Sequence, residues 1–320
     1  MYNELLQNLL SLQSMKTKSM VYIILLIVIA LVAVGFALPA IKMHNMLSGH
    51  WSAEPYSAAE FGVEDEVVAL KSADGLSLTA YEVAVEQPKG VVICLGGIHS
   101  MTATKWYGHS RLFADNGYAS LLLDLRAHGG SSGDRIYAAT REWMDVAAAV
   151  AYIVSQERYR GVKIAVMGLS MGAATAVVSA GKIGDIDALI ALSSYSSWEY
   201  NFNLNVAQQV PKPFAQLLSP FVNVVTRLRF GGYADITPEN QITNLGARPA
   251  LLVQSVGDKL VPFANFERLT AAAPQVEQWV VEGDNHCIIE DFVHPQTNAQ
   301  YCERIVEFLN SVANDRGTEN

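Results

Sequence analysis

The sequence has few cysteines and few charged residues. Its 320 residues contain three cysteines, Cys94, Cys287 and Cys302, an odd number without the spacing of a zinc site. This pattern argues against both a disulfide framework and a structural metal. Lysine and arginine together number 22, against 31 acidic residues, and they form no cluster. Because nucleic-acid-binding proteins carry a concentrated basic patch, we expect no nucleic-acid partner.

One long segment has no charge at all. Residues 20–40, MVYIILLIVIALVAVGFALPA, would span about 30 Å as a helix, which matches the apolar core of a bilayer. A buried core helix is one alternative, but it would normally show a polar face. A cleaved signal peptide is another, but its apolar region would be shorter, and Pro39 interrupts the cleavage pattern. We therefore expect an uncleaved transmembrane helix.

Lysines on either side of this segment indicate its orientation. Lys16 and Lys18 precede it, and Lys42 closely follows it. By the positive-inside rule, this difference of one charge favours a cytoplasmic N-terminus and places the remainder of the chain outside the membrane. The expected organisation is an N-terminal tail (1–19), a transmembrane helix (20–40), a linker (41–60), an α/β domain (61–313) and a polar tail (314–320).

From residue 61 onward, short apolar runs alternate with segments of helical spacing. Asp74-Gly75 separates the first two runs and is typical of a hairpin turn. The later runs predict a mostly parallel, eight-stranded sheet with helices on both faces. Residues 198–247 form the longest interval between strands and predict a small lid. The expected strands are 64–70, 76–84, 90–97, 118–124, 162–168, 187–194, 250–255 and 276–282, and the expected helices include 139–158, 213–230, 263–273 and 299–312.

A serine between two glycines stands where an apolar strand meets a helix of small residues. In the stretch VMGLSMGAATA, Ser170 lies between Gly168 and Gly172. A G-x-S-x-G turn puts its serine in a strained conformation with an exposed hydroxyl. Glycine-rich turns also bind phosphate, but neither common phosphate-binding pattern fits here. Ser170 is therefore the candidate nucleophile.

A serine nucleophile needs a general base that is held by an acid. Asp258 directly follows the apolar run 250–255, and His286 follows the run 276–282. The order Ser, Asp, His, with each residue after its own strand, predicts a catalytic triad. The alternatives are a turn or capping role for Asp258 and a solvated surface position for His286. His294 and Asp284 are the reserve candidates.

These motifs resemble the α/β-hydrolase superfamily, and they look closest to bacterial hydrolases of the serine-aminopeptidase and monoacylglycerol-lipase-like type. The resemblance covers about residues 62–312 and includes GLSMG, VGDKLVP, the His286 loop and DLRAHGGSSG (124–133). It implies the α/β-hydrolase fold and serine hydrolysis with neither metal nor organic cofactor. In the last motif, Asp124, Arg126 and His128 would order the loop rather than take part in catalysis.

One position departs from the pattern of these relatives. Leu95 occupies the place where the superfamily usually has histidine, at the end of the third strand. The loop donates a backbone amide there, so the oxyanion hole can survive the change. We assign its donors to the amides of Gly97 and Met171, with Ile98 as the alternative to Gly97.

The expected activity is hydrolysis of carboxylic esters by a membrane-anchored serine hydrolase, with a small-molecule or lipid-like acyl substrate. The alternatives are a peptidase or amidase of the same fold and a non-catalytic binding module. Tyr195 and Trp198 follow the sixth strand and are candidate substrate-binding residues, together with Tyr200 and Phe202. These aromatic residues could equally pack the lid onto the sheet. The sequence does not indicate the oligomeric state.

Overall fold

The computed structural model describes residues 1–99 and 102–314, with only the backbone of residues 3–6 and 9. The described residues form one eight-stranded sheet in the order β1-β2-β4-β3-β5-β6-β7-β8. Strand β2 is antiparallel to both of its neighbours, β1 and β4, and all other pairs are parallel, so the sheet is mostly parallel, as the sequence predicted. The strands are β1 (Glu66–Lys71), β2 (Ser77–Val83), β3 (Gly90–Leu95), β4 (Ala119–Leu123), β5 (Lys163–Leu169), β6 (Ala188–Leu192), β7 (Ala250–Ser255) and β8 (Glu277–Val281).

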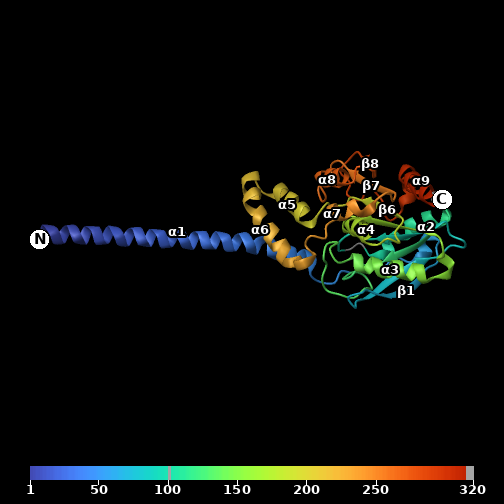
Figure 1. Ribbon diagram of the computed structural model, residues 1–320, viewed down its shortest axis with the longest axis horizontal. Coiled ribbons are helices and arrows are strands. Elements are labelled where there is room, and N and C mark those ends of the chain that lie inside the picture. Colours follow the sequence, from blue (N-terminus) through green and yellow to red (C-terminus); the bar gives the residue numbers. More distant parts are fainter. Residues whose placement is uncertain (100–101, 315–320) are drawn as a thin grey trace.

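Helices bury both faces of the sheet (Figure 1). The helices α3 (Trp143–Ser155), α4 (Met171–Lys182) and α8 (Ala264–Ala272) contribute to the core on one face. The helices α2 (Tyr107–Asp115) and α9 (Ala299–Asn314) contribute to the core on the other. The central strands β3 to β7 are buried almost throughout, which explains why they read as continuous apolar runs. Their carboxyl ends meet at one edge of the sheet.

The N-terminal helix is longer than the sequence predicted. Helix α1 runs from Tyr2 to Leu47, so it includes most of the expected tail and the first part of the expected linker. Its N-terminal part projects away from the rest of the chain (Figure 1). Among the described residues, α1 is the one helix long and apolar enough to cross a membrane, over Leu10–Leu47, which is compatible with either an anchor or a signal sequence. Of the expected tail 314–320, residues 315–320 lie outside the described residues.

The last turns of α1 pack against helix α6 (Lys212–Phe230). Every fourth residue of α1 from position 35 is buried there, and the rings of Phe36 and Phe221 are 4.8 Å apart. A side chain on Gly35 would meet the Phe221 ring, so glycine permits this close approach. The buried residues are Gly35, Pro39, Met43 and Leu47. The last turns of α1 therefore pack on the α/β domain, and residues 41–47 of the expected linker are helical.

The predicted lid region is mainly helical. Besides α6, it contains α5 (Trp198–Gln209) and the short α7 (Pro238–Ile242). The sequence did not predict α5 as a helix, although its start carries a recognisable cap, because the Ser197 hydroxyl accepts a hydrogen bond from the Tyr200 amide at 3.1 Å. Helices α5 and α6 pack on one another at the end of the domain from which α1 emerges (Figure 1).

Candidate active site

Ser170 lies in a strained turn between β5 and α4. Its backbone has φ 57° and ψ −117°, a conformation that side-chain-bearing residues rarely adopt. The turn is possible because a Cβ on Gly168 would lie 2.3 Å from the Gly172 carbonyl carbon, and one on Gly172 would lie 2.2 Å from the Leu95 carbonyl oxygen. The two glycines therefore let the first turn of α4 lie directly against the end of β3.

Asp258 and His286 form a hydrogen-bonded pair beyond the ends of β7 and β8. His286 Nδ1 lies 2.7 Å from Asp258 Oδ2. The Asp258 carboxylate is fully buried and also accepts from the Leu260 and Val261 amides, at 2.8 and 3.0 Å, and from Gln254 Nε2 at 3.1 Å. Because an ionised carboxylate only accepts, Nδ1 must carry the shared proton. In the neutral ring, Nε2 is then left free to accept a proton.

Two serines hold the histidine loop in place. The Ser193 hydroxyl, just after β6, donates to the His286 carbonyl at 2.7 Å, and the Ser255 hydroxyl, at the end of β7, donates to the Asn285 carbonyl at 2.7 Å. The Cys287 amide donates to Asn285 Oδ1 at 2.9 Å. Neither serine was predicted as part of the site from the sequence. Their position at strand ends was the available signal, but serine is common in such turns for purely local reasons.

Ser170 and His286 line the same cavity, whose volume is about 330 Å³. Among the described residues, no hydrogen bond joins the two side chains. Gly97, Ile98 and Met171 also line the cavity. The predicted nucleophile, base and oxyanion donors therefore come together at one place. They follow three different strands, β3, β5 and β8.

The reserve candidates lie elsewhere. His294 is exposed, pairs with Asp291 at 3.0 Å and stacks on Phe61, and it does not line the cavity. Asp284 is exposed and does not line the cavity either. The geometry thus favours Asp258 and His286 over both reserves.

Most of the cavity wall is apolar. Tyr195 and Trp198, the predicted substrate-binding residues, both line it, and so does Phe202. Tyr200 does not, because its ring lies beneath the Arg268 guanidinium at 4.3 Å. Burial raises the pKa of the Tyr195 hydroxyl, which therefore stays neutral. The other lining residues are Lys42, Met46, Leu169, Asn201, Asn205, Val206, Gln209, Leu260, Val261 and Cys287.

The residues of the DLRAHGG motif hold the loop that carries Gly97. His128 Nε2 accepts a hydrogen bond from the His99 amide at 3.1 Å. Burial lowers the pKa of His128 to about 4, so the ring is neutral and able to accept. The Asp124 carboxylate accepts from the amides of Ala103 and Gly130, at 2.8 and 2.9 Å. None of these side chains lines the cavity, so their contacts order the loop.

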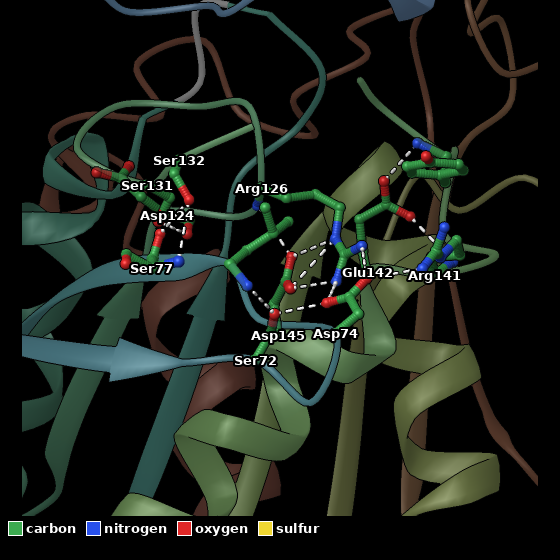
Figure 2. Close-up of polar contacts among 12 residues, drawn as sticks. Ser72, Asp74, Ser77, Asp124, Arg126, Ser131, Ser132, Arg141, Glu142 and Asp145 are labelled. Atoms are coloured by element: carbon green, nitrogen blue, oxygen red, sulfur yellow. Dashed lines mark hydrogen bonds and ion pairs between the residues drawn. The ribbon is translucent and has the colours of Figure 1, made fainter. Parts of the chain in front are cut away.

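Arg126, in the loop after β4, forms buried ion pairs that hold this loop in place (Figure 2). Its guanidinium reaches Asp145 at 2.6 Å and Asp74 at 2.7 Å, and Arg141 reaches Asp74 at 2.8 Å. Burial opposes ionisation of Asp74, but hydrogen bonds from Arg126 and Ser72 outweigh it and lower the pKa of Asp74 to about 2. The network links the β1–β2 hairpin to the loop after β4 and to α3.

Two residues of the wall come from a segment that the sequence analysis assigned to the linker. Lys42 and Met46 of α1 line the cavity beside Ser170. Lys42 Nζ donates to Gln209 Oε1 of α5 at 3.0 Å. The spacing of the apolar residues 43, 46 and 47 is typical of a helix, but three residues are too few to predict that this segment lines the cavity.

Known proteins resemble this chain in sequence and in fold. The family described as serine aminopeptidase, S33, matches residues 86–244. The uncharacterized protein YqkD of Bacillus subtilis (strain 168) is 26% identical over 257 residues, which cover 78% of this chain and 81% of that protein.

Two solved structures show the same fold. The Pyrococcus furiosus esterase Pf2001 superposes with a TM-score of 0.64 at 22% identity, covering 83% of this chain and 98% of the esterase. The Pyrococcus horikoshii acylaminoacyl peptidase gives 0.56 at 15% identity, covering 78% of this chain and 41% of the peptidase. At such identities the superpositions show the fold alone. Together with the match to the serine aminopeptidase family, the two superpositions support a hydrolase of the α/β-hydrolase superfamily.

Proposed function

We propose that this protein is a serine hydrolase that cleaves carboxylic esters, with Ser170 as nucleophile, His286 as general base and Asp258 as its orienting acid. One observation carries the proposal: the strained Ser170 shares a cavity with a histidine that a buried carboxylate holds at 2.7 Å. A serine hydroxyl is a poor nucleophile without such a base. The hydrogen-bond donors around the Asp258 carboxylate fix its position, which supports a fixed orientation of the His286 ring.

The mechanism has two halves. His286 Nε2 takes the Ser170 proton as Oγ attacks the acyl carbonyl, and Asp258 stabilises the imidazolium. The oxyanion accepts hydrogen bonds from the amides of Met171 and Gly97, or Ile98 in place of Gly97. The Met171 amide begins α4, where helix amides lack internal partners and the helix dipole favours an anion. The alcohol leaves with the proton from Nε2, and an activated water then releases the acid.

The cavity favours an ester over a peptide. Apart from the Cys287 thiol and the Tyr195 phenol, Lys42 and His286 are the only residues lining the cavity that can carry a charge. The lining contains no carboxylate that could bind the amine of a peptide. The apolar wall suits an acyl chain. The solved esterase with this fold supports the same choice, while the serine aminopeptidase match and the acylaminoacyl peptidase keep amide hydrolysis as the second candidate.

A substrate panel tests this choice. p-Nitrophenyl esters of increasing chain length should be hydrolysed by the full chain in detergent solution, whereas aminoacyl-p-nitroanilides should react at least about a hundredfold more slowly, because the cavity offers no anionic partner for an α-amine. The measurement is kcat/KM for each substrate. Faster cleavage of an anilide than of any ester would instead make the protein a peptidase or amidase.

We further propose that α1 anchors the protein in a membrane and that the catalytic domain lies outside it. The apolar length of α1 supports anchoring, and the lysine bias around residues 20–40 supports the orientation. The chain should remain in the pellet after alkaline carbonate extraction of membranes. Protease added to intact spheroplasts should digest the domain. Protection until lysis would reverse the orientation, and a mature N-terminus after residue 37 would show a cleaved signal.

A further inference from the structure

The active-site cavity continues toward the apolar part of α1. An open hollow along this helix is lined by Leu38, Ile41, Lys42, Asn45 and Met46. Two of these residues, Lys42 and Met46, also line the cavity that holds Ser170. The two hollows therefore adjoin.

The spacing of these residues makes one continuous path. Leu38, Lys42 and Met46 are four residues apart, so they lie above one another on a single face of α1. This face adjoins the one that packs on α6. It begins at Leu38, inside the apolar segment 20–40, and ends at Met46 beside the cavity.

Lys42 stands at the junction. Its side chain is exposed, and its ammonium group donates to Gln209 of α5 at 3.0 Å; both residues line the cavity. A lysine that follows an apolar membrane segment places its ammonium at the lipid–water boundary while its methylene stem covers apolar surface. A single exposed hydrogen bond of this kind is easily exchanged for water, so it can open to admit a chain.

Helix α6, which packs on α1, also exposes apolar side chains. On α6, Phe214 and Leu217 are 61% and 66% exposed, and Leu38 of α1 is 55% exposed. Figure 1 shows α5 and α6 at the end of the domain that faces the projecting part of α1. Exposed apolar residues gathered beside a membrane-spanning segment fit contact with the lipid surface that would surround that segment.

We propose that the Leu38–Lys42–Met46 face of α1 is the entrance of the active site, along which a single long acyl chain passes from the bilayer to Ser170. The substrate class is then an amphiphilic ester whose chain remains partly in the membrane. This inference rests on the proposed ester hydrolysis and anchoring. It makes the membrane helix part of the substrate site and not only an attachment.

The test compares two esters on the full chain reconstituted in vesicles of a diether phosphatidylcholine, which contains no hydrolysable ester. One ester is p-nitrophenyl dodecanoate, which partitions into the vesicles, and the other is p-nitrophenyl acetate, which stays in the buffer. Lys42→Trp should lower the ratio of kcat/KM for dodecanoate to that for acetate about tenfold, because the indole fills the junction. Leu38→Trp, one turn away on the same face, should lower the same ratio.

Ala37→Trp is the matched control, because Ala37 is exposed on α1 and lines neither hollow. It should leave the ratio unchanged within about twofold. An unchanged ratio in both Lys42→Trp and Leu38→Trp would overturn the inference, and so would an equal fall in Ala37→Trp. If the unaltered chain hydrolyses neither ester, the proposed function itself is wrong, which separates the two failures.

Discussion

Replacing Ser170 with alanine should lower kcat for ester hydrolysis by roughly 10⁴- to 10⁶-fold, the range seen when a triad nucleophile is lost. The effect is large because, among the residues that line the cavity, the only other hydroxyl is that of Tyr195, which does not lie on the turn between β5 and α4. The fold should persist. The Ser170 amide donates a hydrogen bond to the Leu192 carbonyl, and the Ser170 carbonyl accepts one from the Ala174 amide. Both hydrogen bonds use backbone atoms only, so alanine retains them.

Ser179 of the same helix supplies a control for this substitution. It is fully buried, and its hydroxyl has no hydrogen-bond partner among the described residues. Ser179→Ala should therefore leave kcat within about twofold of the unaltered chain. Circular dichroism checks folding for both variants. If Ser170→Ala keeps a tenth or more of the original kcat, the nucleophile is another residue.

Gly172→Ala should lower kcat/KM by about 10²- to 10³-fold, the range seen when one oxyanion donor is lost. The added Cβ would lie 2.2 Å from the Leu95 carbonyl oxygen and 2.4 Å from that of Gly96. Both atoms belong to the backbone, so the strand end and the loop that carries Gly97 must move away from α4. That movement separates the two amides proposed to hold the oxyanion.

Gly184→Ala is the matched comparison, because a Cβ there meets nothing within 4 Å and its backbone needs no left-handed conformation. It should retain full activity. Steady-state kinetics on p-nitrophenyl acetate distinguish the two variants. Near-normal activity in Gly172→Ala would mean that the loop after β3 does not contribute to the oxyanion hole.

The sheet was predictable because each strand has a strong local signature. Apolar runs in β3 to β8 are too short for helices and are bounded by turn residues, and Asp74-Gly75 marks the single hairpin before them. The gathering of the candidate catalytic residues was predictable for the same reason. In a parallel sheet the carboxyl ends lie at one edge, so Ser170, Asp258 and His286 had to come close together.

The remaining features depend on contacts between distant parts of the chain. Burial of Met43 and Leu47 against α6 could not be read from residues 41–47, which look like a mixed linker when α6 is unknown. Helix α5 lacks a clear apolar stripe, so periodicity gave no signal for it. Lys42 lines the cavity because α1 packs on α6 and α6 packs on α5. Tertiary structure therefore decided the part of the cavity nearest α1.

The most direct test of the account is the position at which an alkyl fluorophosphonate reacts with the folded full chain. Such a probe modifies a serine only when a neighbouring base activates it. Mass spectrometry of the tryptic peptide 164–182, which contains Ser170 and Ser179, can locate the adduct. The account predicts one adduct, on Ser170, that is lost in His286→Gln. An adduct on Ser179 or on another peptide, or no adduct at all, would contradict it.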